Sequence, residues 1–103
     1  MAKPMKVRAR NDGAVTDVRV LMRHDMETGQ RKNADGEPIP AHYIQNVTVR
    51  HAQRVVMSAQ WGPAVSKNPF LGFKFLGGAA GDRIEVTWVD NKGDSRTDET
   101  LIT

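Results

Sequence analysis

The sequence predicts an all-β fold, an immunoglobulin-like antiparallel β-sandwich of about seven strands with no disulfide. Segments in which apolar and polar residues alternate recur about every ten residues, and turn-forming residues separate them. No window shows the apolar period of a helix. The 103 residues include no cysteine, so neither a disulfide nor a thiolate site is available to this chain.

Seven segments fit the strand pattern. They are residues 5–10, 15–24, 42–50, 54–61, 70–76, 83–90 and 95–103. In the third segment, Tyr43, Gln45, Val47 and Val49 are predicted to share one face. The predicted core consists of the inward-facing residues Val18, Val20, Tyr43, Val47, Val49, Met57, Trp61, Phe73, Phe75, Ile84, Val86 and Trp88.

Length and composition indicate one soluble domain that spans residues 1–103. The net charge of +3 is mild, and the basic residues are scattered among 12 acidic ones, so no nucleic-acid partner is expected. No apolar run approaches the roughly 20 residues that a membrane span needs. The first residues lack the apolar core of a signal peptide, so export would depend on another chain.

One long segment, residues 24–40, fits neither strand nor helix periodicity. It contains charges of both signs, the turn signals Thr28-Gly29 and Asp35-Gly36, and a Pro38-Ile39-Pro40 exit. Unstructured loops longer than about a dozen residues are uncommon in compact domains and are usually functional or disordered. Its mixed composition differs from that of a simple linker. We therefore expect an ordered loop with a function.

A copper site is one hypothesis for this loop. His24 and Met26 pair an imidazole with a thioether, which are ligands that soft copper ions accept, and a small periplasmic copper-binding sandwich is the alternative function. Only one such pair exists, and His51 is predicted at the opposite end of a strand from His42. The five methionines also suit the filling of a cysteine-free core.

Catalysis has less support than binding. Asp25, Glu27, Asp35 and Glu37 lie in a loop that no pattern buries, so no carboxylate pair is set up for acid–base chemistry. The glycine-rich connection of residues 77–81 joins two strands and opens no helix, so it is not a phosphate site. We expect no enzyme activity.

A binding surface is the remaining interpretation. Edge strands of a sandwich offer unpaired backbone groups to a partner. Tyr43 and Ile44 form an aromatic and apolar patch at the junction of loop and strand, and Arg31 has the fork geometry for a partner carboxylate.

The loop also carries a family resemblance. The run His-Asp-Met-Glu-Thr-Gly-Gln-Arg-Lys of residues 24–32, followed by Asp35-Gly36, Ile39-Pro40 and Tyr43-Ile44, resembles the SoxZ family, the Z subunit of the sulfur-oxidation (Sox) carrier. Asn68-Pro69-Phe70 and the run Thr-Trp-Val-Asp-Asn-Lys-Gly of residues 87–93 extend the resemblance over nearly the whole chain.

The resemblance implies an immunoglobulin-like, non-catalytic subunit that pairs tightly with SoxY. SoxY would carry thiosulfate-derived sulfur on the cysteine of a C-terminal Gly-Gly-Cys-Gly-Gly arm. The heterodimer would present this adduct to the other Sox enzymes in the periplasm through transient docking. SoxY would also supply the export signal, with the Z subunit exported in the folded pair. No cofactor and no metal are implied.

The resemblance also directs attention to residues for partner binding. The predicted set is His24, Met26, Glu27, Thr28, Gly29, Arg31, Ile39, Pro40, Tyr43 and Ile44. Replacing Arg31 or Tyr43 by alanine is expected to weaken pairing or docking without unfolding the domain. The sequence leaves open which edge meets SoxY, and whether the isolated chain covers a vacant apolar face by forming a homodimer.

Overall fold

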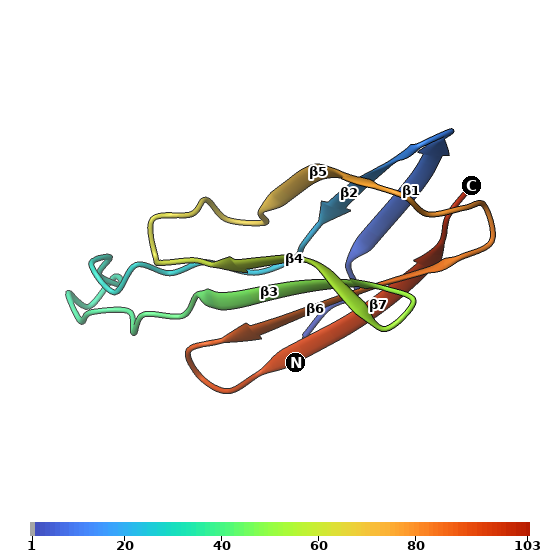
Figure 1. Ribbon diagram of the computed structural model, residues 1–103. Coiled ribbons are helices and arrows are strands. Elements are labelled where there is room, and N and C mark those ends of the chain that lie inside the picture. The colour runs from blue at the N-terminus through green and yellow to red at the C-terminus, as the bar shows by residue number, and fades with distance from the viewer. Residues whose placement is uncertain (1) are drawn as a thin grey trace.

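The computed structural model describes residues 2–103, which form seven strands and no helix (Figure 1). All seven predicted segments are strands. They are β1 (Lys6–Asp12), β2 (Val15–Leu21), β3 (Ile44–His51), β4 (Arg54–Gln60), β5 (Phe70–Leu76), β6 (Arg83–Asp90) and β7 (Ser95–Leu101). In the described part of the chain, no helix long and apolar enough to cross a membrane is found.

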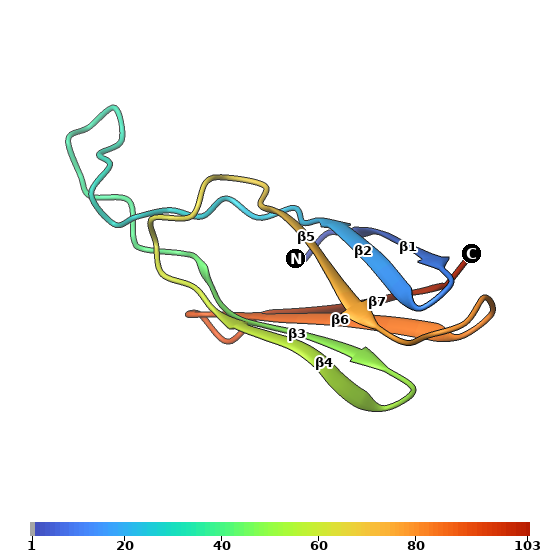
Figure 2. The ribbon, with the colours of Figure 1, turned by 45° about the horizontal axis from the view of Figure 1, so that its top comes forward.

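The strands form two antiparallel sheets that face each other (Figure 2). One sheet has the order β1-β2-β5 and the other β4-β3-β6-β7. The two-residue turn between β3 and β4 has positive φ at both Ala52 and Gln53, which matches the twist of the adjoining strands. The predicted immunoglobulin-like sandwich is therefore confirmed.

The core lies between the central strands of the two sheets. Of the predicted core, Val18, Val20, Val47, Val49, Ile84, Val86 and Trp88 are buried. Tyr43, Met57, Trp61, Phe73 and Phe75 are only partly buried. Four of these five lie on or beside β4 and β5, which are edge strands with one unpaired side each. Periodicity gives the face of a residue and not the position of its strand in the sheet.

The predicted facing of residues 43–45 is wrong. The pairing of β3 with β6 shifts its register between Ile44 and Asn46, and such a bulge moves the preceding residues to the other face. Ile44 is therefore fully buried, whereas Gln45 is exposed. Met22 and Met26, which were not in the predicted core, are buried in the same core as Ile44, and Sδ of Met26 contacts the backbone N–H of Ile44.

The segment between β2 and β3 extends beyond the end of the sandwich (Figures 1 and 2). The molecule is accordingly elongated, with extents of 54 × 19 × 18 Å. The end of β2, the start of β3 and the end of β6 all lie at the base of this segment, because antiparallel neighbours run in opposite directions.

Candidate partner-binding surface

A cluster of the buried His24 and Asp90 with the partly buried His42 lies at the base of the long loop. Nε2 of His24 is 3.0 Å from Oδ2 of Asp90, and Nε2 of His42 is 2.7 Å from the same oxygen. The side chain of Asp90 is fully buried. Sequence reasoning named both histidines but missed Asp90. Asp90 could have been found from its place at the end of a predicted strand, because that end lies at the same end of the sandwich as His24 and His42.

The hydrogen bonds define the tautomer of the neutral His24 ring. The backbone N–H of Met26 donates to Nδ1 of His24 at 3.0 Å, so the neutral ring carries its proton on Nε2 and donates it to Asp90. Oδ1 of Asp90 accepts from the backbone N–H groups of Lys92 and Asp94. The carboxylate thus joins the loop base to the turn between β6 and β7.

The pKa of Asp90 lies below its ordinary value of 3.8. Burial is the largest single influence and raises the pKa, because it disfavours the charged form. Hydrogen bonds from His24 and His42, together with the two backbone N–H groups, favour the carboxylate and outweigh burial. The buried charge is therefore stabilised by four donors.

The cluster has the spacing of a metal site but the wrong hydrogen bonding. One donor atom from each of His24, His42 and Asp90 lies within 4.8 Å of the others. A metal on Nε2 of His24 would move the ring proton to Nδ1, which already accepts the N–H of Met26. Ligating histidines normally donate a proton from the second nitrogen, so the geometry favours a hydrogen-bonded network over a metal site.

The proposed copper pair is also engaged elsewhere. Sδ of Met26 accepts the backbone N–H of Ile44 at 3.3 Å, and Met26 is only 5% exposed. Met26 adopts a left-handed conformation with φ of 52°, which directs its side chain into the core and is uncommon for a non-glycine residue. His24 and Met26 therefore position the backbone of the loop and the start of β3.

Beyond this base the loop is an ordered narrow ribbon. Glu27 and His42 exchange two backbone hydrogen bonds, and the N–H of Ile39 donates to the carbonyl of Arg31 at 2.8 Å. The side chain of Asn33 closes the tip by accepting from the backbone N–H groups of Asp35 and Glu37. These contacts set the shape of the predicted loop without regular strands.

Arg31 is paired within the loop. Its guanidinium donates to both carboxylate oxygens of Glu27, and this contact lowers the pKa of Glu27. The carboxylate that the sequence suggested a partner would supply is thus supplied by the loop itself. Gly29, between the two, has φ of +88°, and a Cβ there would lie 3.1 Å from Cβ of Ala41. Both its conformation and the close approach of the opposite strand of the ribbon require glycine.

The predicted partner-binding residues divide by exposure. His24, Met26 and Ile44 are buried, so they support the loop and offer no contact area of their own in the isolated chain. The remaining seven are accessible. Thr28, Arg31 and Pro40 are exposed, and Glu27, Gly29, Ile39 and Tyr43 are partly buried. The backbone of Tyr43 is fixed by Asn91 in the turn between β6 and β7: its N–H donates to the side-chain Oδ1 of Asn91, and its carbonyl accepts the N–H of Asn91.

A second accessible surface lies where the sandwich is not closed by its own chain. We call this surface, formed by β4, β5 and the residues just after β4, the open side. Inner-face residues Met57 and Ala59 are paired with the buried Val49 and Val47 of β3, yet remain partly accessible. The open side is lined by the apolar residues Met57, Ala59, Trp61, Leu71, Phe73 and Phe75.

The opposite side of the sandwich, between β1 and β7, is closed by polar contacts. The N–H of Met5 donates to Asp98 at 2.9 Å, and Asp98 also pairs with Arg96. Backbone hydrogen bonds join Thr103 to Ala9 and Asn11. The two sides therefore differ in kind. One is sealed by charges and backbone hydrogen bonds, whereas the other presents partly buried aromatic and aliphatic side chains to solvent.

Comparison with known families agrees with the loop motif. The family model described as "Sulphur oxidation protein SoxZ" matches residues 5–101. The chain belongs to the SoxZ family. Its role therefore lies in sulfur oxidation, and the resemblance seen in the residues of the loop is confirmed over nearly the whole chain. A comparison with curated proteins gave no significant match.

Proposed function

We propose that the chain is the non-catalytic subunit of a Sox sulfur carrier and forms a heterodimer with SoxY. In this pair SoxY supplies the thiol that holds the sulfur adduct, because the present chain has no cysteine. The chain supplies a rigid body that docks with the Sox enzymes acting on thiosulfate-derived sulfur. The pair acts in the periplasm, and the export signal of SoxY directs both chains there.

The open side is the observation that supports a permanent partner. Six apolar residues on and beside β4 and β5 pack on the core but remain partly accessible. Permanent interfaces resemble a domain core cut in half, with aromatic and methionine side chains enriched at their centre. Both edge strands also expose backbone groups for strand pairing. We propose that SoxY covers the open side and that the loop beginning at His24 forms the border of this interface.

Co-expression with SoxY tests the pairing. We expect a stable 1:1 complex, identified by its mass in solution, that survives gel filtration. The same chain expressed alone should show either a homodimer or exposed apolar surface that binds a hydrophobic dye, because the open side is then uncovered. Separate elution of the two chains under all salt conditions would contradict the proposed function.

A further inference from the structure

The outer face of the sheet β1-β2-β5 carries an excess of positive charge. Residues that alternate with the buried Ala9, Val18 and Val20 point outward, and the strand register places them side by side. We call this surface the basic face. Its charged residues are Lys6, Arg8, Arg10, Arg19 and Lys74 with Asp12 and Asp17. Five cations against two carboxylates give +3, which equals the net charge of the whole chain.

The register of this sheet includes a pair of like charges, although Asp17 lies opposite both Arg10 and Lys74. Arg8 lies directly opposite Arg19 in the register, and the next position across the sheet is Gly72. Like charges directly opposite each other in a sheet are destabilising. Within residues 2–103, the basic face contains a single ion pair, Arg19 with Asp17 at 3.5 Å, and Arg19 is largely exposed. Such a pair contributes little.

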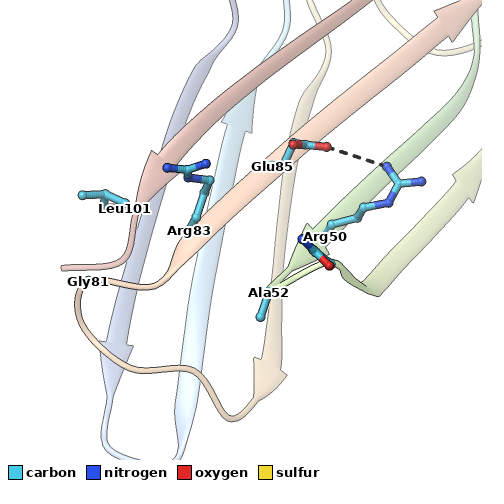
Figure 3. Close-up of a pocket in the computed structure, with 7 residues that line it drawn as sticks. Arg50, Ala52, Gly81, Arg83, Glu85 and Leu101 are labelled. Carbon is cyan, nitrogen blue, oxygen red and sulfur yellow. Dashed lines mark ion pairs between the residues drawn. The ribbon is translucent and has the colours of Figure 1, made fainter.

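The outer face of the other sheet is different. There Arg50 lies 3.9 Å from Glu85 (Figure 3), and Arg83 lies 3.6 Å from Glu99. Each of these arginines has a carboxylate partner on a neighbouring strand. The surplus of positive charge is thus a property of one face, although exposed arginines occur on both.

The basic face has the mixed chemistry of a protein-binding surface. Exposed apolar residues lie along its β5 edge, where Phe70 is 64% and Leu76 84% exposed. The ring of Phe70 lies beside Gly72, where a Cβ would approach it to 3.2 Å. A hollow of about 540 Å³ at the edge where β1 meets β7 is lined by Arg8 and Arg19 together with Leu101. A second hollow, of about 460 Å³, lies on the face itself and is lined by Arg10, Asp17 and Lys74. Arginine beside aromatic surface is typical of protein interfaces.

We propose that the basic face is the docking surface for acidic surfaces of the Sox enzymes that the carrier visits in turn. This inference rests on the proposed function and goes beyond it by separating two surfaces. The apolar open side suits a permanent partner, whereas unpaired charge suits brief encounters, because electrostatic complementarity raises association rates. The two carboxylates within the face favour a protein partner over a polyanion such as nucleic acid, whose phosphates they would repel.

Two matched double variants test the proposal in the complex with SoxY. Arg8→Gln with Arg19→Gln removes two charges from the basic face, and Arg50→Gln with Arg83→Gln removes two from the other face. Association of each complex with the purified Sox enzymes of the same organism is measured across ionic strengths. We expect the first variant to associate about tenfold more slowly at low salt, and the control variant to remain within about twofold of wild type. The thermal midpoint of the first variant should be unchanged or higher.

Other outcomes overturn the inference. If both double variants associate equally slowly with the enzymes, net charge alone explains the effect. If Arg8→Gln with Arg19→Gln associates at the wild-type rate, the basic face is excluded as the docking surface. Binding of wild type to heparin or phosphatidylglycerol vesicles, lost in the first variant while enzyme association is intact, would identify a polyanion or a membrane as the partner. Pairing with SoxY is measured separately. Its failure would contradict the proposed function, whereas normal pairing with no effect of Arg8 and Arg19 would contradict only the docking surface.

Discussion

Replacing Asp90 by asparagine should lower the free energy of unfolding by about 3 kcal/mol. The carboxylate accepts two imidazole N–H groups on one oxygen and two backbone N–H groups on the other. An asparagine amide has only one oxygen, so in either orientation its NH₂ group faces two donors. Chemical denaturation of the isolated chain measures the loss. A difference below about 1 kcal/mol would contradict the role assigned to this buried network.

Asp94→Asn is the matched control for this prediction. Asp94 lies in the same turn, is exposed, and accepts one hydrogen bond from the backbone of Ser95, which an asparagine oxygen also accepts. The control should change stability by less than about 0.5 kcal/mol.

The pH dependence has a defined sign. Because the pKa of Asp90 is lowered in the folded state, its contribution is present above the ordinary value of 3.8 and is lost as the pH falls through the folded value. The difference between wild type and Asp90→Asn should therefore persist from neutral pH to about 4 and shrink only in stronger acid. If this difference in the free energy of unfolding disappears well above pH 4, a titratable group other than Asp90 causes it.

Replacing Met57 by lysine should leave the chain folded and reduce its affinity for SoxY at least about 100-fold, or roughly 2.8 kcal/mol. Met57 is on the inner face of β4 but partly accessible at the open side. In the isolated chain a lysine of similar length can extend its ammonium group to water, at a cost of about 1 kcal/mol. A partner that covers the open side would bury this charge without a counter-ion, which is strongly unfavourable.

Leu101→Lys provides the control for this effect. Leu101 is 56% exposed at the end of β7, so the substitution adds the same charge at an apolar position away from the open side. Calorimetric titration with SoxY should give wild-type affinity for this variant. Equal losses of affinity in both variants, or none in Met57→Lys, would exclude the open side as the principal interface.

The strands were predictable because each is short, alternating and bounded by turn residues. What periodicity could not provide is the order of the strands within the sheets. Phe73 and Phe75 were correctly predicted to face inward, but their partial exposure follows from the edge position of β5. For this reason the open side cannot be predicted from the sequence alone. A run such as Phe-Leu-Gly-Phe-Lys-Phe-Leu has the same pattern in a central strand.

The loop motif identified the family, but the roles of its residues needed the structure. A single bulge between Ile44 and Asn46 buries Ile44 and exposes Gln45, and alternation cannot locate such a shift. The contact of His24 with Asp90 joins residues 66 positions apart. Only the pairing of β6 with β3 brings Asp90 to the loop base, so spacing along the chain suggested a copper pair with Met26 instead of a network with Asp90.

Coverage of the open side by SoxY is tested most directly by ¹⁹F NMR of the chain labelled with 5-fluorotryptophan. The chain has two tryptophans: Trp61 is partly exposed on the open side, and Trp88 is 1% exposed in the core. Trp61→Phe assigns the two resonances. When unlabelled SoxY forms the 1:1 complex, the Trp61 resonance should move and lose its sensitivity to exchange of H₂O for D₂O, while the Trp88 resonance should change little. A Trp61 resonance that keeps its position and its solvent sensitivity in the fully formed complex would contradict the account.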